Sequence, residues 1–536
     1  MLFCLCCGAF GAGNNHVLTS PDGKLKVTAA ADRGGLFWSV DYDGETVMKP
    51  SPINICIDGR QCIDGRLKES GRRSVSTSFA TPFYKKARVE DRYQTLTLRA
   101  NRNVSVEFRA YDDGAAYRLV YSGKKPAVVN SETAEFRFTA DHPCFVPYVN
   151  DNRGGERFCY SFESYYDEVP MSRIYRDSLA ITPLAVCLPS GTKAIVMDAG
   201  VENYPGMMLL GDAASPSLRA VFAPYPTEQA VGGFDRLNLV PTKRADYIAK
   251  LSGPQAMPWR AVVVTRRDAD ILNCDMAQRL APACRLKDTS WIRPGKVAWD
   301  WWNNTNLTGV DFVSGMNTPT YKYYIDFAQR NHLEYIIIDE GWSGKESLTE
   351  QLNPDIQLDE LIAYGRERGV GVILWSSWRN LIANNPEGSI EGTEAVMKHY
   401  ADRGVKRLQN RLLRPRRPAG HRLSLPHCRL CRAPPSARRL PRPEALRHSA
   451  RLSERGQLRG REGTGELQVG TARWRRPSAQ PAALRRHRTL PAHARRTYGL
   501  HARSDDQRHA QQLLRQQRPP DEPGNTRAPN GHVHPL

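Results

Sequence analysis

The chain has 536 residues, enough for two to four domains with large buried cores. Its formal net charge of +20 arises in one place: residues 407–536 hold 29 Arg, no Lys, no Ile and 8 acidic residues, whereas residues 1–406 carry a net charge of −1. Segments that bind phosphate usually mix Lys with Arg, so this distribution argues against a specific nucleic-acid partner.

The first segment, MLFCLCCGAFGAG, is apolar and ends in small residues. We interpret residues 1–15 as a signal segment, which predicts a periplasmic or secreted protein. The segment lacks a basic start, so a misplaced start codon is the alternative. No run of 18 apolar residues follows, and we expect no membrane span.

Residues 16–285 have the pattern of an all-β domain. Short alternating runs such as KLKVTAA, FWSVDYDG and AYRLVYSG recur every 8–12 residues or so. Asp-Gly pairs separate many of them and tolerate the positive φ of hairpin turns; they stand at 22–23, 43–44, 58–59, 64–65 and 113–114. We predict a large β-sandwich.

From residue 286 strands and helices alternate. We predict strands at VAWDWW (297–302), YIIIDEGW (335–342) and VGVILWSSW (370–378), and helices over 318–332, 355–369 and 393–404. Three βα units imply a parallel sheet, and residues 286–406 fit the first part of a (β/α)8 barrel. A fourth strand should begin near Gly404, but the pattern stops at Lys406.

The first barrel strand ends in a Trp-rich cluster that is a candidate sugar site. Aromatic faces stack on the C–H surface of a pyranose, and a carboxylate accepts hydroxyl hydrogen bonds. Trp299, Asp300 and Trp302 are therefore predicted to bind substrate at the C-terminal end of the strand. The alternative is a Trp cluster in the barrel core.

The second barrel strand ends in Asp339, Glu340 and Trp342, which we also predict to bind substrate. Adjacent residues of a strand point to opposite faces, so only one of the two carboxylates is expected to face the sugar. The alternative is a structural ion pair with a neighbouring loop.

Together these residues resemble glycoside hydrolase family 97, which comprises exo-acting α-glucosidases and α-galactosidases. The resemblance rests on SPDGKLKVT, VEDRYQTLTLRA, YSFESYYDEVP, KVAWDWWNN, TYKYYIDFAQRNHLEYIIIDEGW and ERGVGVILW, and covers residues 16–406. It implies an N-terminal β-super-sandwich, a catalytic (β/α)8 barrel and a Ca²⁺ ion near the substrate. Glu163, in YSFESYYDEVP, matches the position of a calcium ligand in the family, consistent with the preference of a hard cation for carboxylate oxygen.

The end of the third predicted strand bears on the reaction type. Where the inverting branch of the family carries a Glu base, this chain reads LWSSW (374–378), with no carboxylate. The resemblance therefore implies the retaining branch, whose nucleophile is an Asp on strand four and which uses a second carboxyl group as acid and base. The Asp-Glu-Gly-Trp end of strand two favours an α-galactoside over an α-glucoside.

Residues 407–536 can be explained as the remaining barrel read in the wrong frame. If one extra nucleotide entered the codon of Arg407, codons for RLQNRLLRPRRP (407–418) can spell GFKIDFFDRDDQ, the strand four that the family predicts. Arg411 then stands at the nucleophile position and Gly465 at the acid/base position. Strands four to eight are expected to be absent and the tail disordered; a genuine Arg-rich disordered appendage is the alternative.

The sequence thus predicts a β plus α/β protein: a β-super-sandwich followed by an incomplete (β/α)8 barrel. We expect a retaining, calcium-assisted α-glycosidase acting on an oligosaccharide or glycoside, inactive in this form. A non-catalytic carbohydrate-binding remnant is the second hypothesis. A nucleic-acid binder is the third, and it predicts salt-sensitive binding that truncation at Lys406 removes.

Overall fold

A computed structural model describes the larger part of the β-domain and the beginning of the barrel. The described residues are 15–32, 34–81, 83–149, 156–158, 162, 164–212, 214–232, 238–344, 348–349, 352–377 and 390–411. Most of the predicted signal segment and nearly all of the Arg-rich tail lie outside these ranges.

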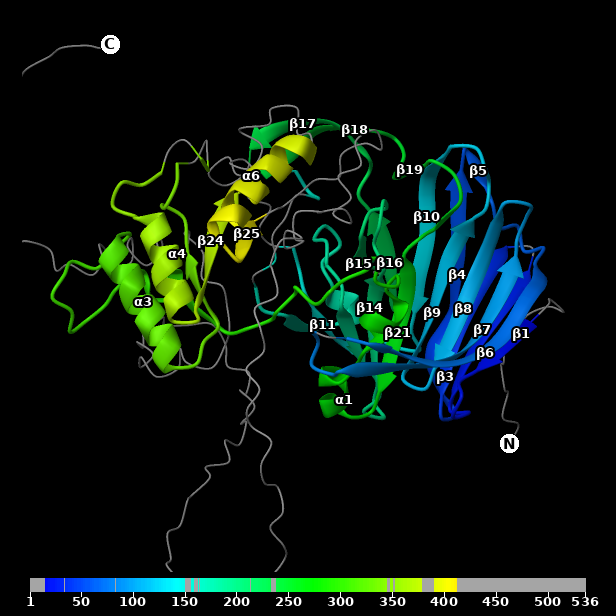
Figure 1. The fold of residues 1–536 in the computed structure, drawn as a ribbon. Helices are drawn as coiled ribbons and strands as arrows, with labels where there is room; N and C mark the ends of the chain where they lie inside the picture. The colour runs from blue at the N-terminus through cyan, green and yellow to red at the C-terminus, as the bar shows by residue number, and fades with distance from the viewer. Residues whose placement is uncertain are drawn as a thin grey trace, which may run out of the picture. The chain divides into compact units, whose positions relative to one another are not determined.

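One sheet of the β-domain has nine strands in the order β1-β2-β3-β4-β10-β16-β15, with β5 beside β4 and β19 beside β10 (Figure 1). The strands are β1 (Asn15–Thr19), β2 (Leu25–Asp32), β3 (Gly35–Tyr42), β4 (Glu45–Ile57), β5 (Arg60–Gln61), β10 (Ala127–Arg137), β15 (Met207–Gly211), β16 (Ser217–Phe222) and β19 (Ala249–Leu251).

The other large sheet has ten strands in the order β12-β11-β13-β14-β21-β9-β8-β7-β6, with β20 beside β9. The strands are β6 (Lys68–Ala80), β7 (Arg88–Arg99), β8 (Val104–Tyr111), β9 (Gly114–Tyr121), β11 (Pro143–Val146), β12 (Asp167–Pro170), β13 (Leu184–Cys187), β14 (Lys193–Ala199), β20 (Gln255–Ala256) and β21 (Trp259–Thr265). A separate hairpin pairs β17 (Pro226–Gly232) with β18 (Asn238–Arg244), and three short helices lie between strands and after β21: η1 (Met171–Arg173), α1 (Asp268–Leu272) and α2 (Met276–Leu280).

The two large sheets pack into a sandwich because each presents alternate apolar residues to a common core. Val27 and Trp38 come from the nine-stranded sheet, and Phe108 and Tyr117 from the ten-stranded sheet; all four are buried in one hydrophobic cluster. Trp38 and Tyr117 meet edge to face across the interface, with ring centroids 5.1 Å apart. The predicted β-sandwich is confirmed.

Two of the predicted Asp-Gly pairs form hairpin turns, whereas Asp64-Gly65 lies outside any turn. Asp43 and Asp58 have φ of 50° and 49°, and the glycines that follow them have φ of 82° and 74°. Two consecutive residues with positive φ are typical of the type I′ turns that match the twist of the strands in a hairpin. These turns fix the register of β3 with β4 and of β4 with β5.

The barrel part contains a parallel sheet in the order β22-β23-β24-β25. Its first three strands are β22 (Val297–Trp299), β23 (Tyr335–Ile338) and β24 (Gly371–Ser377), and its helices are α3 (Thr318–Arg330), α4 (Leu358–Glu367) and α6 (Ile390–Arg403). The three predicted βα units are therefore confirmed. Gly369, which follows α4, has φ of 70°, as expected of a glycine just beyond a helix end.

The first two strands are shorter than predicted. After Trp299 the backbone enters a 3₁₀ helix, η3 (Asp300–Asn303), which ends at Asn304 in the left-handed conformation. β23 ends at Ile338, so Asp339 already lies in the turn beyond the strand. The polar residues that follow each strand belong to the loops at its C-terminal end, where barrel enzymes hold their substrates.

The fourth strand corrects an expectation. We expected strands four to eight to be absent after Lys406, but β25 (Arg407–Arg411) pairs in parallel with β24, Ile373 opposite Arg407 and Ser377 opposite Arg411. The hydrogen bonds of a sheet join backbone groups, and the edge of β24 offers them to any extended segment. The strand therefore forms although its residues do not follow the pattern of a buried barrel strand.

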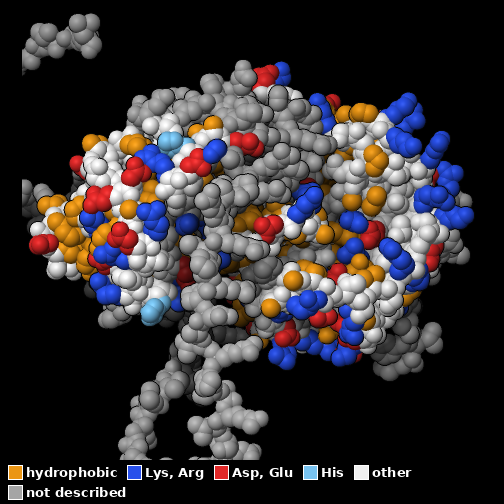
Figure 2. All heavy atoms as spheres, viewed as in Figure 1, with side chains coloured by type: hydrophobic (Ala, Val, Ile, Leu, Met, Phe, Trp, Pro, Cys, Tyr) orange, Lys and Arg blue, Asp and Glu red, His pale blue; other side chains and the backbone are white. Residues whose placement is uncertain are grey.

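The surface of the described part carries charges of both signs. Figure 2 shows Lys and Arg along the edge of the sandwich near β5, and acidic and basic side chains mixed over α3 and α4. This mixture is what a net charge near zero over residues 1–406 produces. None of the described helices combines the length and hydrophobicity needed to cross a bilayer.

Candidate functional site

Trp299 and Asp339 meet at the C-terminal ends of β22 and β23. Alternation along β23 sends Ile336 and Ile338 to the helices, whereas Tyr335 and Ile337 form a separate apolar cluster on the other face. Asp339, the first residue after the strand, lies two positions beyond Ile337 of this second cluster. Trp299 borders this second cluster, and its Nε1 donates a hydrogen bond to Oδ2 of Asp339 over 2.7 Å. The parallel register thus joins two residues that the sequence places 40 positions apart.

Asp300 lies beside this pair and is held by a helix. The hydroxyl of Tyr321, from α3, donates to Oδ2 of Asp300 over 2.5 Å. Asp300 is only 1% exposed, and its Oδ1 has no hydrogen-bond partner among the described residues. The pKa of Asp300 is raised to about 7, mainly by burial; the hydrogen bond from Tyr321 lowers the pKa, and the Asp339 carboxylate adds to the rise.

This raised pKa predicts a loss of stability with rising pH. Between its ordinary value of 3.8 and about 7, the folded protein retains a proton on Asp300 that the unfolded chain has lost, so stability falls as pH rises through this range. Asp300→Asn keeps an acceptor for Tyr321 and removes the titration. We expect the urea midpoint of the barrel part to fall between pH 4.5 and 7.5 in the parent more than in the variant; equal changes would contradict the prediction.

The Trp cluster supplies the aromatic surface that the sequence suggested. The ring of Trp299 is stacked on that of Trp301, with centroids 5.5 Å apart, and on that of Trp302, with centroids 5.9 Å apart. Trp302 is 58% exposed, whereas Trp299 is half-buried. An exposed indole backed by a second ring is a rigid platform on which the apolar face of a sugar can lie.

The other two predicted substrate contacts, Trp342 and Glu340, differ in exposure. Trp342 is 1% exposed and belongs to the core beneath the helices; its Nε1 donates to the backbone oxygen of Trp375 over 2.8 Å. This hydrogen bond secures the loop after β23 to β24, and contact of Trp342 with a substrate stays a prediction. Glu340 is exposed whereas Asp339 is buried; both follow the end of β23, so their substrate contacts also stay predictions.

Sequence reasoning missed Tyr321 and Tyr324. Both lie on the buried face of α3, three residues apart, and Tyr324 donates to Oδ1 of Asn303 over 2.6 Å. They fix the η3 turn from beneath through Asp300 and Asn303. The signal was a pair of Tyr at helical spacing, which sequence alone does not distinguish from ordinary core residues.

The remaining predicted site residues cannot be placed. Glu163 and Gly465 lie outside the described residues, and for Arg411 only the backbone, in β25, is described. Among the described residues, no group of three or more His, Cys, Asp and Glu side chains is arranged to hold a metal ion. The described site therefore consists of an indole platform and the carboxyl groups of Asp300 and Asp339.

Comparison with protein families identifies two matching segments. Residues 18–282 match the domain described as Glycosyl-hydrolase 97 N-terminal, and residues 299–413 match the domain described as Glycoside hydrolase 97. The second match extends through β25, and it contains Trp299, Asp300 and Asp339.

Curated relatives and a solved structure agree with these matches. The chain is 39% identical over 414 residues to a protein of Bacteroides thetaiotaomicron named "Retaining alpha-galactosidase", covering 76% of this chain and 61% of the relative. It is 28% identical over 374 residues to a "Probable retaining alpha-galactosidase" of Streptomyces bingchenggensis, covering 68% of this chain and 52% of the relative. A family 97 enzyme of Pseudoalteromonas sp. strain K8, solved with acarbose, shares the fold with a TM-score of 0.59 and 21% identity, over 74% of this chain and 58% of that one.

Proposed function

Because the chain belongs to glycoside hydrolase family 97, we propose that its barrel derives from an exo-acting α-glycosidase that hydrolyses α-linked sugars with retention. The preferred substrate in this proposal is an α-galactoside, with an α-glucoside as the alternative; the names of both curated relatives support the galactoside. The chain spans only 61% and 52% of the length of these relatives.

The observation that carries the proposal is the joining of Trp299, Asp300 and Asp339 at the strand ends. A carboxyl group with a raised pKa and a second carboxyl group, held by indole and phenol donors, can together donate to and accept from sugar hydroxyls. The exposed Trp302 can cover the apolar face of the same sugar. We assign this group to substrate binding and not to bond cleavage.

We propose further that this chain binds the sugar but does not cleave it. Retaining hydrolysis needs two carboxyl groups about 5–5.5 Å apart, one to attack the anomeric carbon and one to act as acid and then base. In the frameshift interpretation both are replaced, the nucleophile by Arg411 and the acid/base by Gly465. A guanidinium group cannot attack an anomeric carbon, and glycine has no group that transfers a proton.

Calcium is a separate proposal, with Glu163 as one ligand. The described residues do not fit a calcium site: they contain no cluster of three or more suitable side chains, and Asp300 already accepts from Tyr321. We therefore assign no step of the reaction to the ion.

For the chain as given, we expect melting temperatures in EDTA and in millimolar CaCl₂ to agree within about 1 °C, because a ligand present at a concentration far below its Kd adds little to the stability of the folded protein. A clear rise with calcium would show that a site is complete.

Sugar binding by the full chain tests the proposed site directly. We expect weak, saturable binding of methyl α-D-galactoside by ligand-observed NMR, weakened about tenfold by Asp339→Asn, since the loss of one charged hydrogen bond costs roughly 1.5 kcal/mol or more. Trp302→Ala should weaken it similarly. Trp291→Ala, a matched control, removes a Trp that is 44% exposed and bonded only to Asp288 nearby, and should leave binding unchanged. Equal binding by all variants would contradict the assignment.

A non-catalytic carbohydrate-binding remnant is the second candidate. It is favoured by the same platform of stacked indoles, which needs no catalytic carboxyl group to bind a saccharide. The two candidates differ in one result: restoring the reading frame after Lys406 creates hydrolytic activity only if the first is right.

A further inference from the structure

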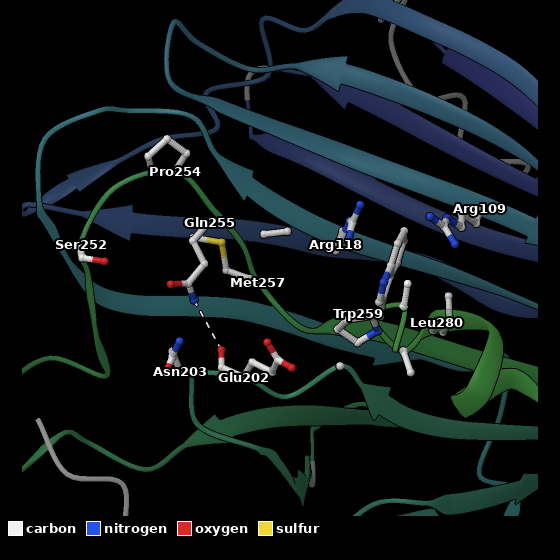
Figure 3. Close-up of a pocket in the computed structure, with 15 residues that line it drawn as sticks. Arg109, Arg118, Glu202, Asn203, Ser252, Pro254, Gln255, Met257, Trp259 and Leu280 are labelled. Atoms are coloured by element: carbon white, nitrogen blue, oxygen red, sulfur yellow. Dashed lines mark hydrogen bonds between the residues drawn. The ribbon is translucent and has the colours of Figure 1, made fainter. Parts of the chain in front are cut away.

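The β-sandwich contains a cavity that lies far along the chain from the strand-end site. It has a volume of about 560 Å³ and lies on the outer face of the ten-stranded sheet (Figure 3). The side chains of Phe108, Tyr117 and Val262 face the sandwich core, so Arg109 and Arg118, one residue later, and Trp259, three residues earlier, face outward and line the cavity. The segments 200–203, 252–257 and 280–283 supply the rest of its lining.

The cavity lining holds a fixed positive charge. Glu107 accepts from Nε of Arg109 over 3.2 Å and lies 2.6 Å from Nη2 of Arg118, so one carboxylate serves two guanidinium groups. The side chains of Arg109 and Arg118 are only 14% and 28% exposed. Glu202, which also lines the cavity, pairs with Arg285 over 3.0 Å, so three guanidinium groups face two carboxylates and one positive charge remains in excess. Arg109 and Arg118 are partly buried, where charge is screened by water less than on the surface.

An indole holds the two guanidinium groups in place. Figure 3 shows Trp259 standing between Arg118 and Arg109, and its ring centroid lies 4.4 Å from the guanidinium carbon of each. Trp259 is 2% exposed and is packed with Leu280 in a small apolar cluster on this face of the sheet. Such stacking orients a guanidinium group before a ligand arrives and so reduces the entropy lost on binding.

Neutral polar groups line the side of the cavity away from these arginines. They are the amide groups of Asn203 and Gln255 and the hydroxyl of Ser252, with the carboxylate of Glu202 nearby (Figure 3). Gln255 donates to the backbone oxygen of Glu202 over 3.5 Å, which leaves its side-chain oxygen as a possible acceptor. Amides and hydroxyls that converge on a partly apolar cavity are typical of sites for polyhydroxylated ligands.

We propose that this cavity binds a saccharide carrying a single carboxylate, that is, a uronic acid. Two oriented guanidinium groups have more N–H donors than Glu107 can accept, and they suit a carboxylate in geometry and charge. The excess of one positive charge matches a monoanion. The sugar hydroxyls then bind to Asn203 and Gln255. This inference is independent of the proposed glycosidase function, because it concerns other residues and an acidic instead of a neutral sugar.

Calorimetric titration of the full chain tests the proposal. The probes are sodium D-galacturonate, D-galactose as the neutral sugar, and sodium acetate as a carboxylate without hydroxyls. We expect galacturonate to bind at least about tenfold more tightly than either, and its affinity to fall with added NaCl. Galacturonate binding no tighter than that of galactose or acetate would overturn the proposal.

Variants locate the site. Arg118→Gln should weaken galacturonate binding about tenfold or more, because it removes the excess charge, and Arg118→Lys should recover part of the loss. Arg72→Gln, an arginine that pairs with Glu69 on the same sheet, is the matched control. Asn203→Gly removes the amide in an exposed loop and suits the positive φ of 51° at this position, so it tests the site without disturbing the sheet. Loss of binding in Asp339→Asn, or unchanged binding in both Arg118→Gln and Asn203→Gly, would place the ligand elsewhere and refute the assignment.

Discussion

Deleting one nucleotide in the codon of Arg407 is expected to convert this chain, which we propose to be inactive, into an α-glycosidase. In the frameshift interpretation the change restores a carboxyl group where Arg411 stands and a second where Gly465 stands, together with the later barrel strands. Because loss of a nucleophile or its partner can cost about 10⁶-fold in rate, we expect hydrolysis of p-nitrophenyl α-galactoside to rise at least about 10⁴-fold. The measurement is release of p-nitrophenol by equal amounts of the two purified chains.

Two controls make this result specific. In the restored chain, replacing the carboxyl group at position 411 by an alanine side chain should abolish the gained activity while leaving the fold intact. The anomer released first, followed by NMR, should have the α configuration if the reaction proceeds with retention. Clear turnover by the unaltered 536-residue chain would refute the proposed inactivity, and an inactive but folded restored chain would refute the frameshift interpretation.

Glu132→Ala is expected to destabilise the β-sandwich by about 3–5 kcal/mol, because it leaves the charge of Arg260 buried with its main partner removed. Both oxygens of Glu132 accept from Arg260, over 2.8 and 2.9 Å, and the two side chains are 1% and 0% exposed. The remaining carboxylate near Arg260 belongs to Asp198, 3.7 Å away. The hydroxyl of Tyr204, which donates to Glu132, would also lose its acceptor.

Glu135→Ala on the same strand is the matched comparison. Glu135 pairs with Arg137 over 2.8 Å, but these side chains are 23% and 42% exposed, so solvent screens the pair and its loss should cost less than about 1 kcal/mol. Urea unfolding followed by Trp38 and Trp259 fluorescence reports on both variants, since both indoles lie in this domain. Similar losses in the two variants would mean that burial does not determine the strength of the Glu132–Arg260 pair.

The fold could be predicted where periodicity and turn residues agreed. Asp43-Gly44 and Asp58-Gly59 form the hairpin turns that their sequence indicates, and the three βα units lie where hydrophobic periodicity placed them. Strand ends were predicted less well. In VAWDWW every residue is compatible with a buried strand, yet the hydrogen bond from Tyr321 to Asp300 accompanies a turn at that residue. A contact between residues 21 positions apart leaves no local trace in the sequence.

In the candidate site, too, the properties that depend on contacts with distant residues could not be predicted from the sequence. Asp339 is buried and Glu340 exposed, but both follow the end of β23, so this difference does not arise from the alternation along the strand that the prediction assumed. The burial of Trp342 could not be predicted, since an aromatic residue near a strand end has the same sequence pattern whether it faces a ligand or the core. Its hydrogen bond to the backbone of Trp375 depends on how the loop folds back. Tyr321 was missed for the related reason that its partner lies on another element.

The strand β25 has a consequence for any chain whose reading frame changes partway through a sheet. In the frameshift interpretation, β24 is the last strand with its original side chains, and it orders Arg407–Arg411 through main-chain hydrogen bonds although their side chains have changed. If that interpretation is right, limited proteolysis should give a resistant fragment that ends several residues past the altered codon, near Arg411 instead of Lys406. Mapping a frameshift from the boundary of a protected fragment would accordingly place the lesion too late.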